Sequence, residues 1–457
     1  MSDTPPKKLP FWFKLAYSIG DLTTSGSIAI VMYYQLFFLT DVVGLRPGLA
    51  GWAVGLGRIW DAVNDPLFGI LSDRIKSRWG RRRVLLLLGA VPLGAAFILM
   101  WLIPPLGPVG LVAYYALTFM LYDSAYTAIH VGYNALTPEL TRDYDERSEL
   151  NGVRMVVAIA GSLGSVILVT VLSWSMGFSR ELFAIVGVAL GVLYAIPPLV
   201  VFRVTRDHRT DHVEDPLPPW VAIKHTMSNR PFRMVMAIYL LSWTTASILS
   251  ALLVYLASYH LRIPDQANYF VLAAEGAGIL FVPVSVKLAT WLDKRWSFII
   301  GSATWALALL GIAALGSEQV PLAYALAVLS GLGVATAYVI PWSMLPDVIE
   351  LDQLRTGQRR EGSYYALAAF FQKLGTGIAL WAMAQLLAFT GYVTPDTGSE
   401  ILPVQPQAAI TALRVFAGPV CAVLLLAAMF VAWKYPIGRQ EHSEHLAALA
   451  GNEEATS

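Results

Sequence analysis

The chain has 457 residues, of which 56% are hydrophobic and 14% are charged, and its mean hydropathy is +0.58. Soluble domains usually contain about 25% charged residues, so this composition excludes a soluble globular enzyme and predicts a polytopic membrane protein. The net charge of +1 argues against a nucleic-acid-binding protein, and the single cysteine excludes both a disulfide framework and a thiolate metal site.

Apolar windows of about 20 residues predict an all-α protein with twelve transmembrane helices. Their centres lie near Ile28, Trp60, Gly94, Tyr122, Leu163, Val192, Ile248, Leu280, Leu307, Val334, Thr376 and Leu425. Twelve helices leave little room for a soluble catalytic domain. The N-terminal sequence "MSDTPPKKLPFWF" lacks the short apolar stretch and cleavage site of a signal peptide, so we expect the first helix to be retained.

Lysine and arginine residues are concentrated in alternate loops, beginning with Lys7 and Lys8 before the first predicted helix. Cytoplasmic loops of membrane proteins carry this excess of positive charge. We therefore expect a multi-pass protein of the cell (inner) membrane with both termini in the cytoplasm.

The predicted helices divide into two sets of six. We expect an N-terminal half over residues 1–202, a cytoplasmic connector over 203–233, a C-terminal half over 234–436 and a cytoplasmic tail over 437–457. The basic stretch "GILSDRIKSRWGRRR" after the second helix is faintly repeated by "VKLATWLDKRW" after the eighth. Paired six-helix halves predict the major facilitator fold, with a substrate site near the membrane midplane.

The second predicted helix contains the polar stretch "RIWDAVNDP", residues 58–66. Since an ionisable side chain at the bilayer centre costs about 2.5 to 3.5 kcal/mol, such residues need a partner or a function. With Arg58 as reference, Asp65 lies about 20°, Asp61 about 60° and Asn64 about 120° around the helix, all in one direction. These side chains share one face.

Two interpretations of this face remain open. In the first, Arg58 pairs with Asp61 and locks two helices together. In the second, the carboxylate and amide oxygens of Asp61, Asn64 and Asp65 hold a cation such as Na⁺, or a proton, and Pro66 leaves a backbone carbonyl oxygen available. We favour the second, because one arginine does not neutralise two carboxylates.

The fourth predicted helix carries a second polar stripe. Its polar residues fall within an arc of about 60°, and they are Asp123, Thr127, His130 and Asn134. The Thr127 hydroxyl is expected to complete the cation site, whereas the other three are expected to hydrogen-bond a polar solute.

Further polar and aromatic residues on other helices are candidates for the same solute site. They are Asp21 and Ser25 on the first helix, Arg154 on the fifth, Tyr338 and Trp342 on the tenth, and Lys373 on the eleventh. Lys373 either donates to the solute or pairs structurally with Asp61 or Asp65. Tyr338 and Trp342 either stack on a sugar ring or pack within the core. Glu275 on the eighth helix is either an interhelical partner or a functional carboxylate.

Four segments of the sequence resemble one family of transporters. They are "YSIGDL", "RIWDAVNDPLFGILSDRIKSRWGRRR", "NALTPELTRDYDERSELNGVRM" and "LPDVIELDQLRTGQRREGSYYALAAFFQKLG". They are similar to the glycoside-pentoside-hexuronide:cation symporters, the melibiose permease group of the major facilitator superfamily. This resemblance implies alternating access, with entry of Na⁺, Li⁺ or H⁺ driving sugar uptake.

The resemblance also implies roles for individual residues. Acidic and amide residues of the family's cation site match Asp61, Asn64 and Asp65, and its hydroxyl matches Thr127. The family's eleventh-helix lysine matches Lys373, and its fifth-helix arginine matches Arg154 with a one-residue shift in some relatives. Where melibiose-type members have sugar-binding aspartates and a stacking aromatic residue, this chain has Ser25, His130 and Asn134. A pentoside, a hexuronide or another solute is therefore expected in place of an α-galactoside.

We therefore expect a cation-coupled symporter of a sugar or glycoside-like solute that is a monomer, binds no nucleic acid and needs no cofactor besides the coupling ion. A non-sugar cargo stays open, such as an organic anion or the lysophospholipids that an animal branch of the superfamily transports. A passive facilitator would keep the fold without needing the cation site, and a membrane-embedded enzyme lacks any catalytic constellation in the sequence. The loop "DRIKSRWGRRR" is expected to hold the cytoplasmic side closed through charge contacts.

Overall fold

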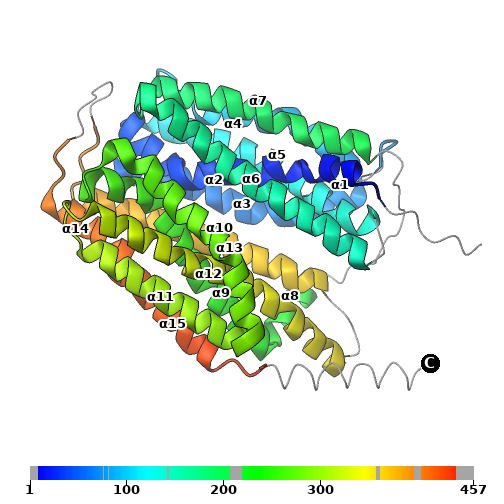
Figure 1. The fold of residues 1–457 in the computed structure, drawn as a ribbon. Coiled ribbons are helices and arrows are strands. Elements are labelled where there is room, and N and C mark those ends of the chain that lie inside the picture. The colour runs from blue at the N-terminus through cyan, green and yellow to red at the C-terminus, as the bar shows by residue number, and fades with distance from the viewer. Residues whose placement is uncertain are drawn as a thin grey trace, which may run out of the picture. The chain divides into compact units, whose positions relative to one another are not determined.

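The computed structural model describes residues 9–75, 77–80, 82–140, 144–205, 219–356, 361–395 and 403–438. Within these ranges the regular structure is entirely helical, without a β-strand, which confirms the predicted all-α class. The chain divides into two compact units (Figure 1). The first comprises Met1–Val213 with Val393–Val404, and the second comprises Glu214–Tyr392 with Gln405–Ser457.

The first unit contains seven α-helices among its described residues, shown from blue to green in Figure 1. They are α1 (Phe11–Ser18), α2 (Gly20–Phe37), α3 (Pro47–Arg74), α4 (Arg83–Met100), α5 (Pro108–Leu140), α6 (Tyr144–Met176) and α7 (Arg180–Val204). A π-helical turn, η1 (Phe38–Val42), continues α2. Helix α3 packs against α5, α2 against α6, and α4 against both α5 and α7.

The second unit contains the remaining helices. They are α8 (Pro219–Ser228), α9 (Arg230–Tyr255), the π-helical turn η2 (Leu256–His260), the 3₁₀ turn η3 (Pro264–Gln266), α10 (Ala267–Leu292), α11 (Lys294–Ala314), α12 (Val320–Thr356), α13 (Glu361–Phe389), α14 (Gln407–Val415), the π-helical turn η4 (Phe416–Val420) and α15 (Cys421–Trp433). Its apolar core includes buried side chains from α9, α11, α12, α13 and α15.

Ten helical segments of the described chain are long and apolar enough to cross a membrane, and each contains one of the predicted centres. The other two predicted spans are α3 and α5, whose polar side chains interrupt their apolar sequences. With 28 and 33 residues, both exceed the roughly 20 residues that a hydrocarbon core requires. Helices α3 and α5 complete the predicted twelve spans, and they are the two that carry the predicted polar faces.

The connector predicted over 203–233 is partly helical. Helix α7 continues to Val204, α8 occupies Pro219–Ser228, and α9 already begins at Arg230; residues 206–218 lie outside the described ranges. The short α8 escaped prediction because tertiary contacts stabilise it: it packs against α9 and α13, and Asn229 Nδ2 donates a hydrogen bond to Tyr364 Oη at 3.0 Å. Of the predicted tail, the structure describes residues 437 and 438.

Glycines allow the helices of the first unit to approach closely. A Cβ atom on Gly161 of α6 would lie only 2.9 Å from the Cα of Leu22 on α2, and one on Gly57 of α3 would overlap the Phe119 ring of α5. Side chains at these positions would force the helix pairs apart. The two contacts, α2 with α6 and α3 with α5, bring the predicted polar residues together.

Candidate functional site

The predicted cation residues converge where α3 meets α5. Asn64 and Thr127 are each 1% exposed, and Asp61 is 2% exposed. The Thr127 hydroxyl donates a hydrogen bond to Asp65 Oδ1 at 3.0 Å, and Asn64 Nδ2 donates one to Asp123 Oδ2, also at 3.0 Å. We call Asp61, Asn64, Asp65, Asp123 and Thr127 the cation cluster.

The Asn64 side chain is only half satisfied. Its Nδ2 atom is bonded to Asp123, but its carbonyl oxygen Oδ1 is buried and has no hydrogen-bond donor among the described residues. A buried acceptor without a partner costs about 1 to 3 kcal/mol, and native structures rarely keep one without a reason. A cation bound beside Asn64 would satisfy this oxygen.

Arg58 does pair with Asp61, but the pair does not lock two helices together as the first interpretation of the sequence expected. Its Nη1 atom lies 3.5 Å from Asp61 Oδ2, and both residues belong to α3, one turn apart. This pair therefore does not join two helices. The guanidinium reaches α5 through a cation–π contact, 5.1 Å from the centre of the Phe119 ring. A separate bond from Trp60 Nε1 to Ser124 Oγ, at 2.9 Å, ties α3 to α5.

The chemistry of the cation cluster suits a singly charged ion. Among the described residues, no three His, Cys, Asp or Glu side chains are grouped closely enough to hold a metal ion by themselves. A cation here would therefore depend on the neutral oxygens of Asn64 and Thr127 besides the carboxylates of Asp61 and Asp65. Such an all-oxygen ligand set fits a hard cation.

A second group of polar residues lies where α5 and α2 meet α6. Arg154 on α6 binds Asp21 on α2 through both carboxylate oxygens, with distances of 2.7 Å from Nε and 3.0 Å from Nη2. Tyr133 on α5 also donates to Asp21 Oδ2 at 2.7 Å, and its ring lies 4.3 Å from the guanidinium carbon. Bidentate pairs of this kind are strong and hold a defined geometry.

Arg154 continues the network along α5. Its Nη1 atom donates to Thr137 Oγ1 and its Nη2 atom to Asn134 Oδ1, each at 2.8 Å, while Asn134 Nδ2 lies 2.9 Å from His130 Nε2. We call Asp21, His130, Asn134, Thr137 and Arg154 the arginine network. Both His130 and Asn134 are exposed, so they can meet a solute.

The structure places the predicted solute residues of the first unit in two groups. His130, Asn134, Arg154 and Asp21 are brought together, and Ser25 lies half-buried one turn beyond Asp21 on α2. Asp123, by contrast, contacts Asn64 in the cation cluster. The sequence prediction missed Thr137 and Tyr133. Extending the α5 stripe by one turn beyond Asn134 would have found Thr137, since its direction on the helix falls beside that stripe.

The predicted residues of the second unit lie on two helices. Tyr338 and Trp342 are on α12, and Lys373 is half-buried on α13. The Tyr338 ring packs 4.8 Å from Trp243 of α9, whose Nε1 atom donates to Thr376 Oγ1 at 3.0 Å.

One face of the Trp342 ring is already occupied. The ring of Tyr365 stacks on it with the centroids 5.7 Å apart, although Trp342 keeps 37% of its surface exposed. The packing interpretation of this tryptophan therefore holds for one of its faces. Glu275 lies half-buried in α10.

The basic loop between α3 and α4 contributes to the packing of its own unit. Arg83 is buried, and its guanidinium donates to the carbonyl oxygens of Trp79 at 3.1 Å and Phe202 at 2.5 Å. It also lies over the Phe202 ring, at 4.6 Å. These contacts join the start of α4 to the C-terminal end of α7. Lys76 and Arg81 of the same loop lie outside the described residues.

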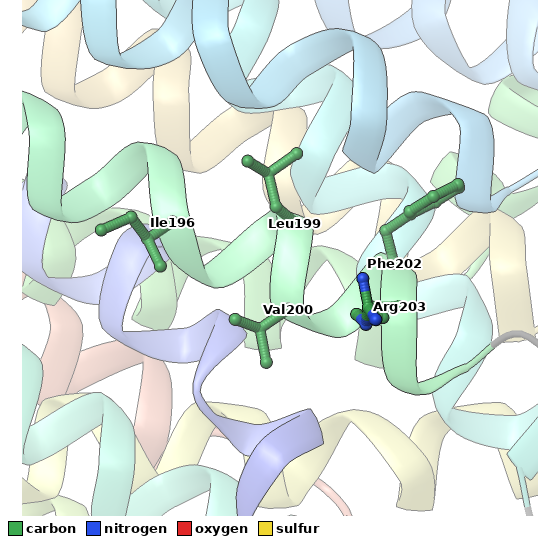
Figure 2. Close-up of a pocket in the computed structure, with 5 residues that line it drawn as sticks. All are labelled: Ile196, Leu199, Val200, Phe202 and Arg203. Atoms are coloured by element: carbon green, nitrogen blue, oxygen red, sulfur yellow. The ribbon is translucent and has the colours of Figure 1, made fainter.

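A cavity of about 300 Å³ lies along the C-terminal part of α7 and is lined by Ile196, Leu199, Val200, Phe202 and Arg203 (Figure 2). None of these five is a predicted site residue, and four of them are apolar. Apolar surface on a membrane-spanning helix is ordinarily covered by lipid, so this cavity does not compete with the polar clusters as the candidate site.

Comparison with known proteins places the chain among transporters. The family described as MFS/sugar transport protein matches residues 16–439. An uncharacterized symporter of Synechocystis is 32% identical, with 96% of each chain covered. The Escherichia coli protein YagG, provisionally named a glycoside/cation symporter, is 27% identical over 92% of this chain and 90% of its own.

Other relatives and a solved structure extend this result. The sodium-dependent lysophosphatidylcholine symporter 1 of Xenopus tropicalis is 24% identical over 97% of this chain and 90% of its own. The inward-open xylose transporter XylE of E. coli has the same fold, with a TM-score of 0.64 and 15% identity over 96% of this chain and 99% of that one. The relatives named here are transporters rather than enzymes, and the chain belongs to the family of MFS/sugar transport proteins.

Proposed function

We propose that the protein is a secondary active transporter that couples the entry of Na⁺, Li⁺ or H⁺ to the uptake of a sugar or glycoside. The observation that carries the proposal is the unsatisfied Asn64 carbonyl oxygen, buried beside the carboxylates of the cation cluster. A passive facilitator has no need to keep such a group in a membrane-spanning helix, because the group destabilises the protein when no cation is present.

Helix α5 provides the connection between the two clusters. Asp123 and Thr127 contact α3, and about two turns beyond Thr127 on the same helix Asn134 contacts Arg154 of α6. The Tyr126 ring stacks on His130 with the centroids 5.5 Å apart, which adds a rigid contact between the two levels. A cation that fixes α5 against α3 would therefore pre-order the solute contacts, so we expect the cation to bind first.

The identity of the cargo is part of the proposal. The family description and the name of the E. coli relative favour a sugar, whereas the name of the Xenopus relative favours a lysophospholipid. The exposed part of the arginine network offers imidazole and amide groups at His130 and Asn134. Such groups suit a solute rich in hydroxyl groups. We also propose that Ser25, Tyr338, Trp342 and Lys373 take part in solute binding, and that a monomer transports the solute by alternating access.

Uptake into proteoliposomes tests the coupling. We expect a radiolabelled glycoside to be concentrated only when an inward Na⁺ or H⁺ gradient is imposed. Equilibration at the same rate without a gradient would show a facilitator. The solute is found by measuring thermal stability against sugars, uronates and lysophosphatidylcholine, each with and without Na⁺. Stabilisation by lysophosphatidylcholine alone would show that the cargo is a lipid and not a sugar.

A further inference from the structure

Arg154 is the positive charge of the arginine network, and the structure shows how that charge is used. Four hydrogen bonds from its guanidinium are accounted for: two to Asp21, one to Thr137 and one to Asn134. An arginine has five N–H donors in a fixed plane. At most one donor is therefore left for a solute, and the charge is opposed at contact distance by the Asp21 carboxylate.

The hydrogen bonds also define the orientation of the Asn134 side chain. Because arginine only donates, the atom of Asn134 that faces it is the carbonyl oxygen, and the amide NH₂ must face His130. Asn134 therefore presents its carbonyl oxygen to Arg154 and its amide group to His130. The charge that opposes Arg154 at contact distance is that of Asp21.

We propose that Asp21 is a specificity-determining residue that makes this site select an uncharged solute over an anionic one. The inference rests on the proposed function, in which the arginine network faces the solute. A carboxylated sugar placed against Arg154 would compete with a carboxylate that already holds the bidentate position, and it would be repelled by that carboxylate. An uncharged sugar meets the imidazole and amide of His130 and Asn134 without this penalty.

The substitution Asp21→Asn reverses the preference. It preserves the size of the side chain but removes the opposing charge, which leaves Arg154 with a net positive charge and at least one freed donor beside the exposed end of the network. A uronate then supplies the missing carboxylate.

The experiment uses two probes that differ only in one group, methyl β-D-glucoside and methyl β-D-glucuronide. Their dissociation constants are measured with the purified full-length protein by calorimetry, in Na⁺ and without a gradient. For the wild type we expect the glucoside to bind more tightly. For Asp21→Asn we expect the ratio of the two constants to shift at least tenfold in favour of the glucuronide.

Two further variants separate charge from packing. The double variant Asp21→Asn with Arg154→Gln lacks both charges, so the gain in glucuronide binding should disappear. Glu146→Gln removes another buried carboxylate of the same unit, which lies 3.8 Å from Lys14 Nζ, and it should leave the ratio unchanged.

A wild-type ratio of dissociation constants in Asp21→Asn would overturn the inference, as would a gain in glucuronide binding that persists in the double variant. A wild type that binds the glucuronide more tightly than the glucoside would also overturn it, and that measurement needs no variant. Failure of the proposed function looks different: the wild type would show no gradient-driven uptake of any sugar, while the change in anion binding would still be measurable.

Discussion

Asn64 on α3 donates a hydrogen bond to Asp123 on α5 at 3.0 Å and at the same time buries its own carbonyl oxygen without a donor. One side chain thus joins two helices and offers an acceptor that no residue in the described part of the chain satisfies. A cation bound beside Asn64 would supply the missing partner of this oxygen, because buried polar groups are usually paired.

Replacing the Asn64 side chain should therefore weaken cation binding. For Asn64→Ala we expect the Na⁺ or H⁺ concentration giving half-maximal uptake to rise at least about tenfold, which corresponds to about 1.4 kcal/mol of cation binding. Uptake is measured in proteoliposomes over a range of cation concentrations. Ser124→Ala is the matched control, because it removes a different bond between the same helices, that with Trp60. Equal effects of the two substitutions would argue for a packing role of Asn64.

The two carboxylates of α3 should be required for coupling. We expect Asp61→Cys and Asp65→Cys each to abolish cation-stimulated uptake, because each removes a charged oxygen ligand, while the protein still folds into the membrane. Na⁺ should also raise the unfolding temperature of the wild type and have no such effect on either variant, since a ligand stabilises only the state that binds it. Full coupling in both variants would reject the assigned cation site.

Substitutions of two glycines on α6 should differ in their effect on stability. Gly161→Ala should lower the unfolding temperature and weaken solute binding, because its Cβ atom would lie 2.9 Å from the backbone of Leu22 and push α2 away from α6. Gly164→Ala, one turn along, has no atom within 4 Å of the added Cβ and should be neutral or slightly stabilising, since alanine favours a helix over glycine. Thermal unfolding and solute titration of both variants measure this, and a loss shared by the two would contradict it.

Arg83 should be a structural residue. We expect Arg83→Ala to destabilise the protein by about 2 kcal/mol or more, because charged hydrogen bonds to the carbonyl oxygens of Trp79 and Phe202 are lost. Arg78→Ala should leave the unfolding temperature nearly unchanged, since this arginine is exposed and lies over the Trp79 ring. If Arg83→Ala slows transport without lowering the unfolding temperature, the gating role predicted for the loop applies to this residue as well.

The outcomes for single residues show where sequence-based reasoning reached its limit. Helical periodicity placed Asp61, Asn64 and Asp65 on one face, and Asn64 and Asp65 do form hydrogen bonds with α5. The same reasoning assigned Asp123 to the solute but did not predict that Asp123 accepts a hydrogen bond from Asn64. Periodicity gives the direction of a side chain around its own helix, but it does not say which neighbouring helix lies in that direction.

The sequence by itself determined the membrane class, the twelve helices and the two polar stripes, because hydropathy and helical spacing are local properties of the chain. Only the tertiary structure decided the partners. Thr127 and Asp65 are 62 residues apart, and Arg154 and Asp21 are 133 residues apart. Their contacts depend on which faces of the helices lie close together. The close approach of helices at glycines such as Gly161 controls that packing. The pairing of Asp21 with Arg154, and with it the opposition of these two charges, therefore arises from the packing of the helices.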